Sequence, residues 1–357
     1  MANEQNENNK KLPFTFRQMS HVKSKPIKWL WKGKFARGKV SMLAGHPGLG
    51  KTQITSSMAA IVSTGGSWPV DNTICEKGNV ILFSAEDDAE DTIRPRLEAA
   101  GADLDCVFIL DAVLDDHGKP RPFNMIYDLQ RLSEMLEHIG NVALIVIDPI
   151  TAYLGGTDSH KNADIRALLS PLADLAAKHG SAIVCVTHLN KGGGGEALLR
   201  ITGSLAFVAA ARAAYLVVKD QENNSRRLFL PIKNNVGNDQ SGLAFTLEPH
   251  LLPDDIETSR VRWESEAVLI SADDAMTNSV EPEGRSALEG AKEFLSDLLS
   301  QGAVSSVQVR SEAKEAGHAW PTVRRAQKAL GVKSHKDGMQ GPWLWRLPSN
   351  AEDAQNL

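Results

Sequence analysis

The segment that most restricts the fold of this chain is the stretch AGHPGLGKTQ at residues 44–53, which contains the pattern GxxxxGK[ST]. A strand-like apolar run, 39–45, precedes the glycines, and a helical pattern, 52–65, follows them. In this context the glycines allow successive backbone N–H groups to turn inward, and the helix N-terminus adds a favourable dipole. The segment therefore predicts a phosphate-binding loop (P-loop) between a strand and a helix.

The loop also predicts which groups hold ATP and Mg²⁺. Lys51 would neutralise the β- and γ-phosphates, and the Thr52 hydroxyl would coordinate Mg²⁺. The second magnesium ligand is expected at the end of a buried strand, where Asp148 closes the run ALIVID; alternatively, this aspartate only caps the following turn. The positions expected to contact the nucleotide are Gly45, His46, Pro47, Gly48, Leu49, Gly50, Lys51, Thr52 and Gln53.

Hydrolysis needs a further group that polarises the attacking water. Many P-loop ATPases carry a glutamate directly after the magnesium-binding aspartate, but residue 149 here is proline. Glu86 ends the run NVILFSAE, which we expect to neighbour the P-loop strand at the same sheet edge, and it is the predicted general base. Asp87 and Asp88 compete for this role but are better placed as helix N-caps. His188 ends the run SAIVCVTH and is predicted to sense the γ-phosphate; the alternative is a surface histidine at a strand end.

Strand-like and helical segments alternate through the first half of the chain. The strand-like runs after the P-loop are continuously apolar, which is typical of a parallel sheet covered by helices on both faces. These runs are 79–86, 106–112, 142–150 and 181–188, and the helical patterns between them are 89–101, 124–140 and 162–180. After about residue 213 only strands follow, at 213–219, 226–233, 242–248 and 259–264. We expect them to extend the same α/β sheet with antiparallel strands.

A smaller module is predicted at the C-terminal end. Helices at 286–300, 306–317 and 322–332, the last capped by Thr322, precede a two-stranded wing, and this is the pattern of a winged helix. Arg324, Arg325 and Lys328 would then face a DNA groove, Lys333 and Lys336 would face its backbone, and Trp343 and Trp345 would pack the wing. A winged helix that binds protein is the alternative. The predicted organisation is a tail (1–12), an ATPase domain (13–271), a linker (272–285), this module (286–348) and a second tail (349–357).

Charge and composition narrow the class of protein. Residues 303–346 contain eight lysines and arginines against three acids, whereas the whole chain has a net charge of −5. A basic module on an acidic body is compatible with DNA contact, although a solvated basic surface explains it equally well. The three cysteines, Cys75, Cys106 and Cys185, show no paired spacing, and no apolar run reaches the roughly 18–20 residues of a membrane helix. We therefore expect a cytoplasmic protein without a membrane contact.

Taken together, these motifs resemble the RecA superfamily of P-loop NTPases, and within it the RepA-type group of hexameric replicative helicases and ATPases of mobile elements. The resemblance covers roughly residues 25–248 and rests on six segments, which are WLWKGKFARGKVSMLAGHPGLGKTQ, VILFSAEDD, LIVIDPITAYLGG, VTHLNKG, ITGSLAFVAAARAAYLV and LPIKNN. It implies a RecA-like fold and assembly of identical subunits into a ring, with ATP bound between neighbours. The resemblance also implies an arginine finger in trans, which matches Arg212; an arginine that covers an apolar face is the alternative. Lys233 matches a lysine of the family, and the resemblance implies a catalytic role for it, but Asn235 stands where related ring helicases often have arginine.

The resemblance further implies two loops that hold single-stranded DNA in the central channel. They match residues 151–164 and 190–204, in which Lys161, Lys191 and Arg200 would contact phosphates. Tyr153 is the one aromatic residue in these loops that could stack on a base. Loops that bind no nucleic acid remain the alternative.

Two functions are compatible with these observations. The first is a ring-forming, DNA-associated ATPase, a RepA-like helicase or helicase-like motor of a plasmid, phage or integrated element. The second is a regulatory or scaffold ATPase whose nucleotide state controls assembly or the binding of a DNA site or partner. A small-molecule kinase is disfavoured because it would need neither the sensor His188 nor the finger Arg212.

Overall fold

The computed structural model describes residues 16–157, 162–189, 205–237, 241–277, 282–300, 302–336 and 343–348. The chain divides into two compact units, Met1–Ala275 and Met276–Leu357. No helix in the described ranges is both long and apolar enough to cross a membrane.

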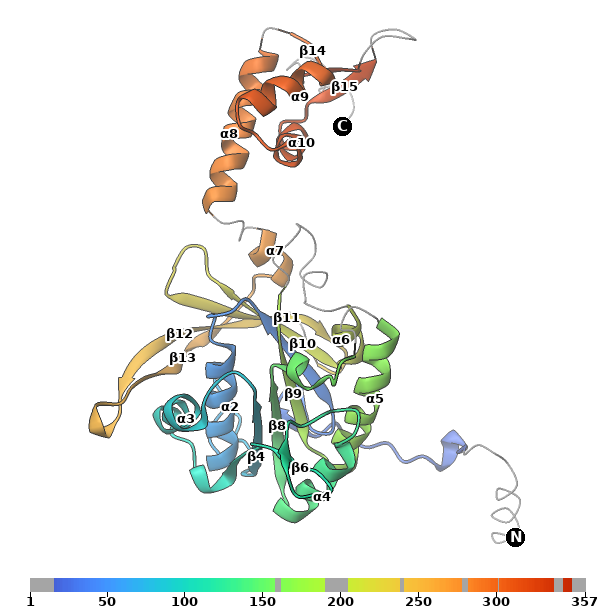
Figure 1. Ribbon diagram of the computed structural model, residues 1–357, viewed down its shortest axis with the longest axis vertical. Helices are drawn as coiled ribbons and strands as arrows, with labels where there is room; N and C mark the ends of the chain where they lie inside the picture. The colour runs from blue at the N-terminus through green and yellow to red at the C-terminus, as the bar shows by residue number, and fades with distance from the viewer. Residues whose placement is uncertain are drawn as a thin grey trace. The chain divides into compact units, whose positions relative to one another are not determined.

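A nine-stranded sheet forms the centre of the first unit (Figure 1). Its strand order is β13-β12-β11-β10-β3-β9-β8-β4-β5. The parallel strands are β3 (Val40–Gly45), β4 (Asn79–Ser84), β5 (Val107–Ile109), β8 (Val142–Asp148), β9 (Ala182–His188) and β10 (Ala213–Lys219). The antiparallel strands are β11 (Arg226–Asn234), β12 (Gly242–Leu251) and β13 (Glu257–Val268). The mostly parallel sheet with an antiparallel extension is therefore confirmed, except that β10 still runs parallel to β3.

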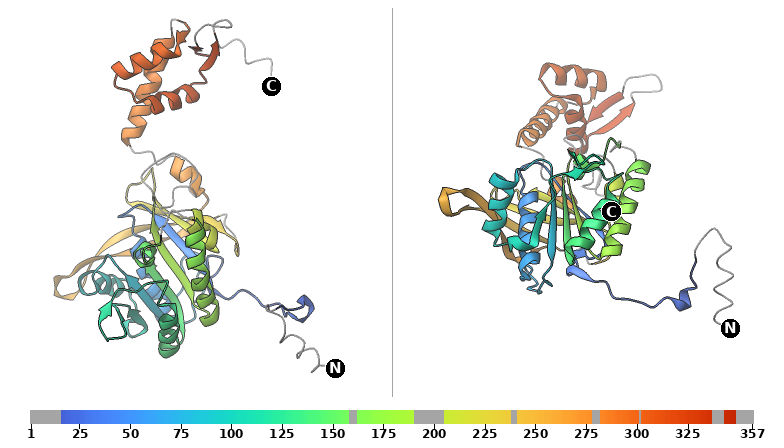
Figure 2. Two further views of the ribbon diagram at one scale, coloured as in Figure 1. Left: turned by 45° about the vertical axis from the view of Figure 1, so that its right-hand side comes forward. Right: turned by 60° about the horizontal axis from the view of Figure 1, so that its bottom comes forward.

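Helices cover both faces of this sheet, as Figures 1 and 2 show. One face carries α2 (Lys51–Thr64) and α3 (Arg94–Ala100), and the other carries α4 (Leu129–Ile139), α5 (Asn162–His179) and α6 (Leu205–Ala210). A π-helical turn, Ala89–Ile93, precedes α3, whose first turn contains Pro95. Asp88 caps that turn by accepting hydrogen bonds from the backbone of Glu90 and Asp91, as predicted for an N-cap. Single 3₁₀ turns lie at Met19–His21, Leu104–Cys106, Ile150–Tyr153 and Pro253–Asp255.

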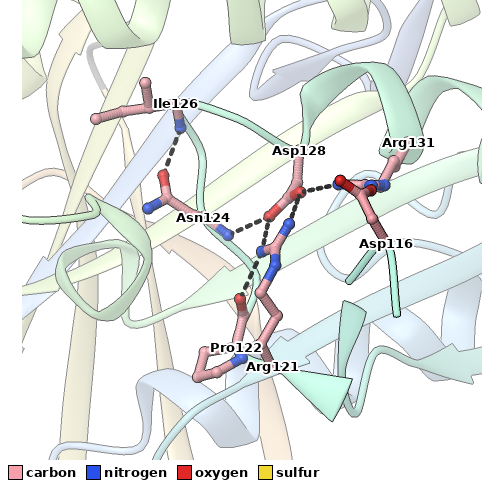
Figure 3. A network of polar contacts seen from close by, with 7 residues as sticks. All are labelled: Asp116, Arg121, Pro122, Asn124, Ile126, Asp128 and Arg131. Atoms are coloured by element: carbon pink, nitrogen blue, oxygen red, sulfur yellow. Dashed lines mark hydrogen bonds and ion pairs between the residues drawn. The ribbon is translucent and has the colours of Figure 1, made fainter. Parts of the chain in front are cut away.

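The helix expected over 124–140 begins only at Leu129, because a buried carboxylate organises the preceding residues as a turn (Figure 3). The Asp128 side chain is fully enclosed and accepts two hydrogen bonds of 2.6 Å from Arg121, one of 3.1 Å from Arg131 and one of 2.8 Å from the Asn124 backbone. The Arg121 guanidinium, ahead of the other donors, lowers the pKa of Asp128 to about 2. This network ties the short hairpin of β6 (Val113–Leu114) and β7 (Pro120–Arg121) to the start of α4.

Aromatic rings join the N-terminal hairpin of β1 (Trp29–Trp31) and β2 (Phe35–Ala36) to the sheet. Trp31 is fully buried and stacks on Trp68 at a centroid distance of 4.6 Å and on Phe229 of β11 at 6.1 Å. The core therefore extends across the antiparallel part of the sheet as well as the parallel part.

Within its described residues, the second unit has three helices and a three-stranded sheet. These are α8 (Pro282–Leu299), α9 (Ser306–Glu315), α10 (Trp320–Ala329) and the strands β14 (Val304–Ser305), β15 (Lys333–Lys336) and β16 (Trp343–Arg346), in the order β14-β16-β15. Ser305 caps α9 through a hydrogen bond to Gln308. The core is formed by buried residues of all three helices together with Val332 and Trp345.

Three local features of this region differ from expectation. The segment expected as a linker, 272–285, includes the boundary between the two units, but it also contains the helix α7 (Ala272–Thr277) and the beginning of α8. Thr322 lies inside α10 rather than at its cap, because Pro321, with its fixed backbone angle, occupies the first turn and Ala319 becomes the N-cap. Trp345 packs in the core as expected, but Trp343 is 54% exposed.

Candidate functional site

The P-loop joins the end of β3 at Gly45 to the start of α2 at Lys51. Gly48 and Gly50 adopt left-handed backbone angles, with φ of 74° and 87°, which residues with a side chain rarely adopt. The Leu49 side chain is buried in the core, so only its backbone can face a phosphate. Gln53 is also buried, and its amide donates a 2.8 Å hydrogen bond to Ser259 of β13. Its side chain is thus directed at the sheet and not at the predicted nucleotide.

The Lys51 side chain contacts the backbone of the P-loop. Its ammonium group donates hydrogen bonds of 3.0 Å to the carbonyls of Gly45 and His46 and lies 3.3 Å from His188 Nδ1. Burial lowers the pKa of Lys51, whereas the carboxylates of Asp148 and Glu86 act in the opposite direction. The Lys51 ammonium group therefore lies between the loop carbonyls and the acids, where it would also contact the phosphates of a bound triphosphate.

Thr52 and Asp148 meet at the carboxyl end of the sheet. The Thr52 hydroxyl donates a 2.8 Å hydrogen bond to Asp148 Oδ2, although the two residues are 96 positions apart. Burial raises the pKa of Asp148, and the Thr52 hydrogen bond and the Lys51 charge oppose this rise. A hydroxyl and a carboxylate oxygen side by side are the hard oxygen ligands that Mg²⁺ prefers, so this pair fits the predicted metal.

Glu86 lies at the site, but its strand has a different place in the sheet from the one expected. Its strand, β4, pairs with β8 and β5, and the strands β8 and β9 separate it from β3. The prediction that it neighbours the P-loop strand is wrong, because β9 and β8 follow β3 in the sheet. Glu86 nevertheless lies beside the P-loop, since its Oε1 is 3.7 Å from His188 Nε2 while the other ring nitrogen of His188 faces Lys51.

The two competing acids have other partners. Asp87 forms an ion pair with Arg96, and Asp88 caps the following helical turn. The Glu86 side chain is 63% exposed, which leaves it open to a water molecule. Of the three adjacent acids, Glu86 therefore remains the best candidate for the base.

Arg212 lies at the opposite edge of the sheet from its own P-loop. Its backbone N–H donates to the carbonyl of Val40, where β3 begins, whereas the P-loop follows the end of β3. The residue is exposed and directly precedes β10. Arg212 is therefore an exposed residue that lies away from the P-loop of its own chain.

Lys233, for which the resemblance implies a catalytic role, contacts the backbone of its own chain in the structure. Its ammonium group donates to the carbonyls of Val208, Ala209 and Ala211, at 2.9, 3.0 and 2.9 Å, at the end of α6. Burial lowers the pKa of Lys233, and the nearby positive charges of Arg212 and Arg166 lower it further. Lys233 thus fixes the turn before Arg212, as expected for a cation at a helix C-terminus. Arg166 was not singled out from the sequence, in which it reads as an ordinary surface residue of a helix.

Only part of the predicted channel loops lies within the described residues. Lys161, Lys191 and Arg200 lie outside the described residues. Tyr153 is described and is only 8% exposed, because its ring packs edge-to-face against Phe83 at 5.6 Å and Phe123 at 6.1 Å. Burial raises the pKa of Tyr153 to about 12. The expectation that Tyr153 offers a stacking surface to a base is therefore wrong.

The basic residues predicted on the second unit are exposed on α10. Arg324, Arg325 and Lys328 all lie on its solvent side. The rings of Trp320 and Trp345 stack at 5.6 Å, with the Arg324 guanidinium above Trp345 and that of Arg310 above Trp320, each 5.5 Å from the ring centroid. Arg310 lies on α9 and was not predicted, because its link to the basic helix exists only through this stacking.

Comparison with known proteins agrees with the P-loop assignment. No curated protein matches the sequence. A family model described as an AAA domain matches residues 6–194, more than half of the chain and the part that carries the P-loop, Glu86, Asp148 and His188. The chain therefore belongs to this AAA-type family of P-loop ATPases.

Proposed function

We propose that this chain hydrolyses ATP as a ring-forming, DNA-associated motor of the RecA-like, RepA type. The observation that carries the proposal is the arrangement at the P-loop. His188 lies between Lys51 and Glu86, and the Thr52–Asp148 pair begins directly after Lys51 in the chain, at the same end of the sheet. This arrangement supplies separate groups for phosphate charge, for the metal and for the attacking water, as phosphoryl transfer requires.

The chemistry assigned to each group follows from its position. Glu86 accepts a proton from water as the water oxygen bonds to the γ-phosphorus, and the bond from that phosphorus to the bridging oxygen breaks. His188, which contacts both Glu86 and Lys51, would register whether a γ-phosphate is present. Mg²⁺ held by Thr52 and Asp148 would neutralise charge on the phosphate oxygens. Products are ADP and inorganic phosphate.

Assembly into a ring is supported by the position of Arg212. The residue is remote from its own P-loop, exposed, and held by a turn that Lys233 fixes. An arginine that stabilises the transition state from a neighbouring subunit needs these properties. A hexameric ring of identical subunits with ATP between neighbours would place Arg212 of one copy at the P-loop of the next.

Contact with DNA is supported mainly by the second unit. Its helices and small sheet follow the order expected of a winged-helix-like module, and α10 presents Arg324, Arg325 and Lys328 to solvent. Single-stranded DNA in the ring channel and duplex DNA at this module are the proposed partners. Cations on one helix face supply the salt-dependent phosphate contacts that such binding needs.

A regulatory or scaffold ATPase is the second candidate. The observation that favours it is the burial of Tyr153, which removes the aromatic stacking surface from the described part of the loop after β8. In this reading nucleotide binding controls assembly, and the second unit recruits a DNA site or a partner protein without unwinding.

The two candidates are distinguished by ATP turnover measured with and without single-stranded DNA at low salt. A motor is expected to hydrolyse ATP several-fold faster when DNA is present and to separate a forked duplex. Turnover that does not respond to DNA, with no strand displacement, would support the scaffold function and overturn the motor. The Glu90→Gln variant, which changes an exposed acid near the site, is the control for the handling of variant proteins.

A further inference from the structure

The antiparallel end of the sheet is in direct contact with the P-loop. Figure 1 shows the long hairpin of β12 and β13 beside α2 and α3, on the face of the sheet that these helices cover. The hairpin is far from the P-loop in sequence, since Gln53 and its partner Ser259 are 206 positions apart. No motif in the sequence indicates that this hairpin has a part in nucleotide binding.

Three contacts connect the hairpin to the start of α2. A Cβ atom added to Gly50 would lie 3.2 and 3.3 Å from the two methyl carbons of Leu247, so Leu247 packs directly on the last glycine of the P-loop. The Gln53 amide donates a 2.8 Å hydrogen bond to the Ser259 hydroxyl. The Trp263 indole donates a 3.2 Å hydrogen bond to the Ser57 hydroxyl.

The contacts follow the geometry of both elements. Positions 50, 53 and 57 are separated by three and four residues and share one face of the helix. On the hairpin, Leu247 pairs with Val261, which lies between Ser259 and Trp263 on the same strand face. One face of the hairpin therefore contacts one face of α2 from its first turn onward.

The position of this contact is significant because the first turn of α2 forms part of the phosphate site. The backbone N–H groups of the P-loop and of this turn must converge on the phosphates, and an error of well under 1 Å weakens such a site. Gly50, at φ 87°, is the N-cap of α2 and directly precedes Lys51. A side chain that contacts Gly50 and a hydrogen bond to Gln53 thus bear on the two residues that flank Lys51 and Thr52.

We infer that Leu247 and Ser259 are positioning residues for the P-loop, and that the β12–β13 hairpin sets the affinity of this chain for nucleoside triphosphate. The inference rests on the proposed function only in that the P-loop binds ATP. The hairpin touches neither Glu86 nor His188 through any contact found in the described residues, so it acts on binding and not on the chemical step.

The test is the affinity for a fluorescent ATP analogue, titrated without DNA, together with kcat and KM for ATP. Ser259→Ala and Leu247→Ala are expected to weaken binding about fivefold each, with a parallel rise in KM and kcat within about twofold. Ser265→Ala on β13 and Leu251→Ala on β12 make the same substitutions at exposed positions of the hairpin and should bind as the wild type does. Ser259→Thr keeps the hydroxyl and should restore the affinity.

Two results of these measurements would overturn the inference. If Ser259→Ala and Leu247→Ala remain folded by thermal melting and bind the analogue as tightly as their controls, the hairpin has no positioning role. A loss of kcat at unchanged affinity would also overturn it. A failure of DNA to stimulate turnover would count against the proposed motor and leave the affinity comparison intact.

Coupling between two sites is reciprocal, so nucleotide bound at the P-loop should also affect the hairpin. This effect gives a second measurement. If the hairpin positions the loop, bound analogue should slow amide hydrogen exchange in residues 246–251 and 257–263 of the wild type. The protection should be smaller in the Ser259→Ala, Leu247→Ala double variant at saturating analogue. Equal protection in both proteins would contradict a direct connection between hairpin and P-loop.

Discussion

Asp148, which is partly exposed, and Asp128, which is fully enclosed, belong to the same unit, and their pKa values shift in opposite directions. Asp128 is enclosed by two arginines and a backbone N–H, and its pKa is lowered to about 2. Asp148 accepts a hydrogen bond from the Thr52 hydroxyl, with Lys51 as a nearby cation, and its pKa is raised by desolvation. The number of cations and donors around each carboxylate decides the direction.

We interpret Asp128 as an acid that stabilises the fold and Asp148 as an acid that takes part in function. The charge of Asp128 is fully compensated, so its interactions stabilise the fold. Asp148 retains charge that its protein partners compensate only in part, and such a group is suited to a bound cation. The predictions below test whether function and stability divide between the two sites in this way.

The largest effect is expected for Asp148→Asn. Loss of the metal-binding carboxylate should lower ATP turnover by about 10³-fold, because metal stabilisation of the transition state contributes several kcal/mol. The melting temperature should stay the same or rise, since a desolvated charge is removed. Phosphate release at saturating ATP and Mg²⁺, together with thermal melting, measures both. If the variant is strongly destabilised, Asp148 stabilises the fold as Asp128 does, and the proposed contrast is wrong.

Glu86→Gln should separate binding from chemistry. Removal of the general base is expected to reduce kcat by about 10²–10³-fold while a fluorescent ATP analogue still binds. Lys51→Ala should lose binding as well, because it removes the cation that faces the β- and γ-phosphates. Normal hydrolysis by Glu86→Gln, relative to Glu90→Gln, would show that the base assignment is wrong.

Arg212→Ala should lower turnover about 10²-fold with nucleotide binding retained. The mixing experiment is sharper, because Lys51→Ala subunits still carry Arg212 and Arg212→Ala subunits still carry an intact P-loop. A mixture of the two inactive proteins should regain part of the turnover if the arginine acts in trans. A mixture that stays inactive, or an active Arg212→Ala variant, would rule out this role.

Asp128→Asn should behave in the opposite way from Asp148→Asn. It leaves the Arg121 guanidinium next to a neutral amide and is expected to destabilise the unit by about 3 kcal/mol in urea unfolding. Turnover of the folded variant at saturating ATP should change far less than that of Asp148→Asn. Unchanged stability would mean that the network in Figure 3 contributes little to the fold.

The smallest effect is a pH dependence of stability. The pKa of Asp128 is about 2 in the folded chain and about 3.9 when unfolded, so the unfolded state binds more protons between these values. The stabilisation from Asp128, about 2 kcal/mol, is fully present above roughly pH 4 and is lost as the pH falls through about 2. Urea unfolding of the wild type should therefore show a steeper acid loss than Asp128→Asn.

Local patterns in the sequence predicted much of the fold and the central part of the site. The order of strands and helices, the P-loop and Asp148 all follow from hydrophobic periodicity and short motifs. Sheet order does not, and so the strand of Glu86 was placed next to β3 although β9 and β8 intervene. Sequence position predicts a nucleotide contact for Gln53 and a base contact for Tyr153, but the fold directs these side chains to Ser259 and to Phe83 and Phe123.

The sequence by itself determined that a glycine-rich loop between strand and helix carries Lys51 and Thr52, because both the loop geometry and its chemistry are local. Tertiary structure alone decided which distant groups share that site. Asp148, His188 and Glu86 converge there because the parallel strands β8, β9 and β4 end at one edge of the sheet. The same long-range packing sets Leu247 and Ser259 against the loop, through contacts that no pattern of neighbouring residues can specify.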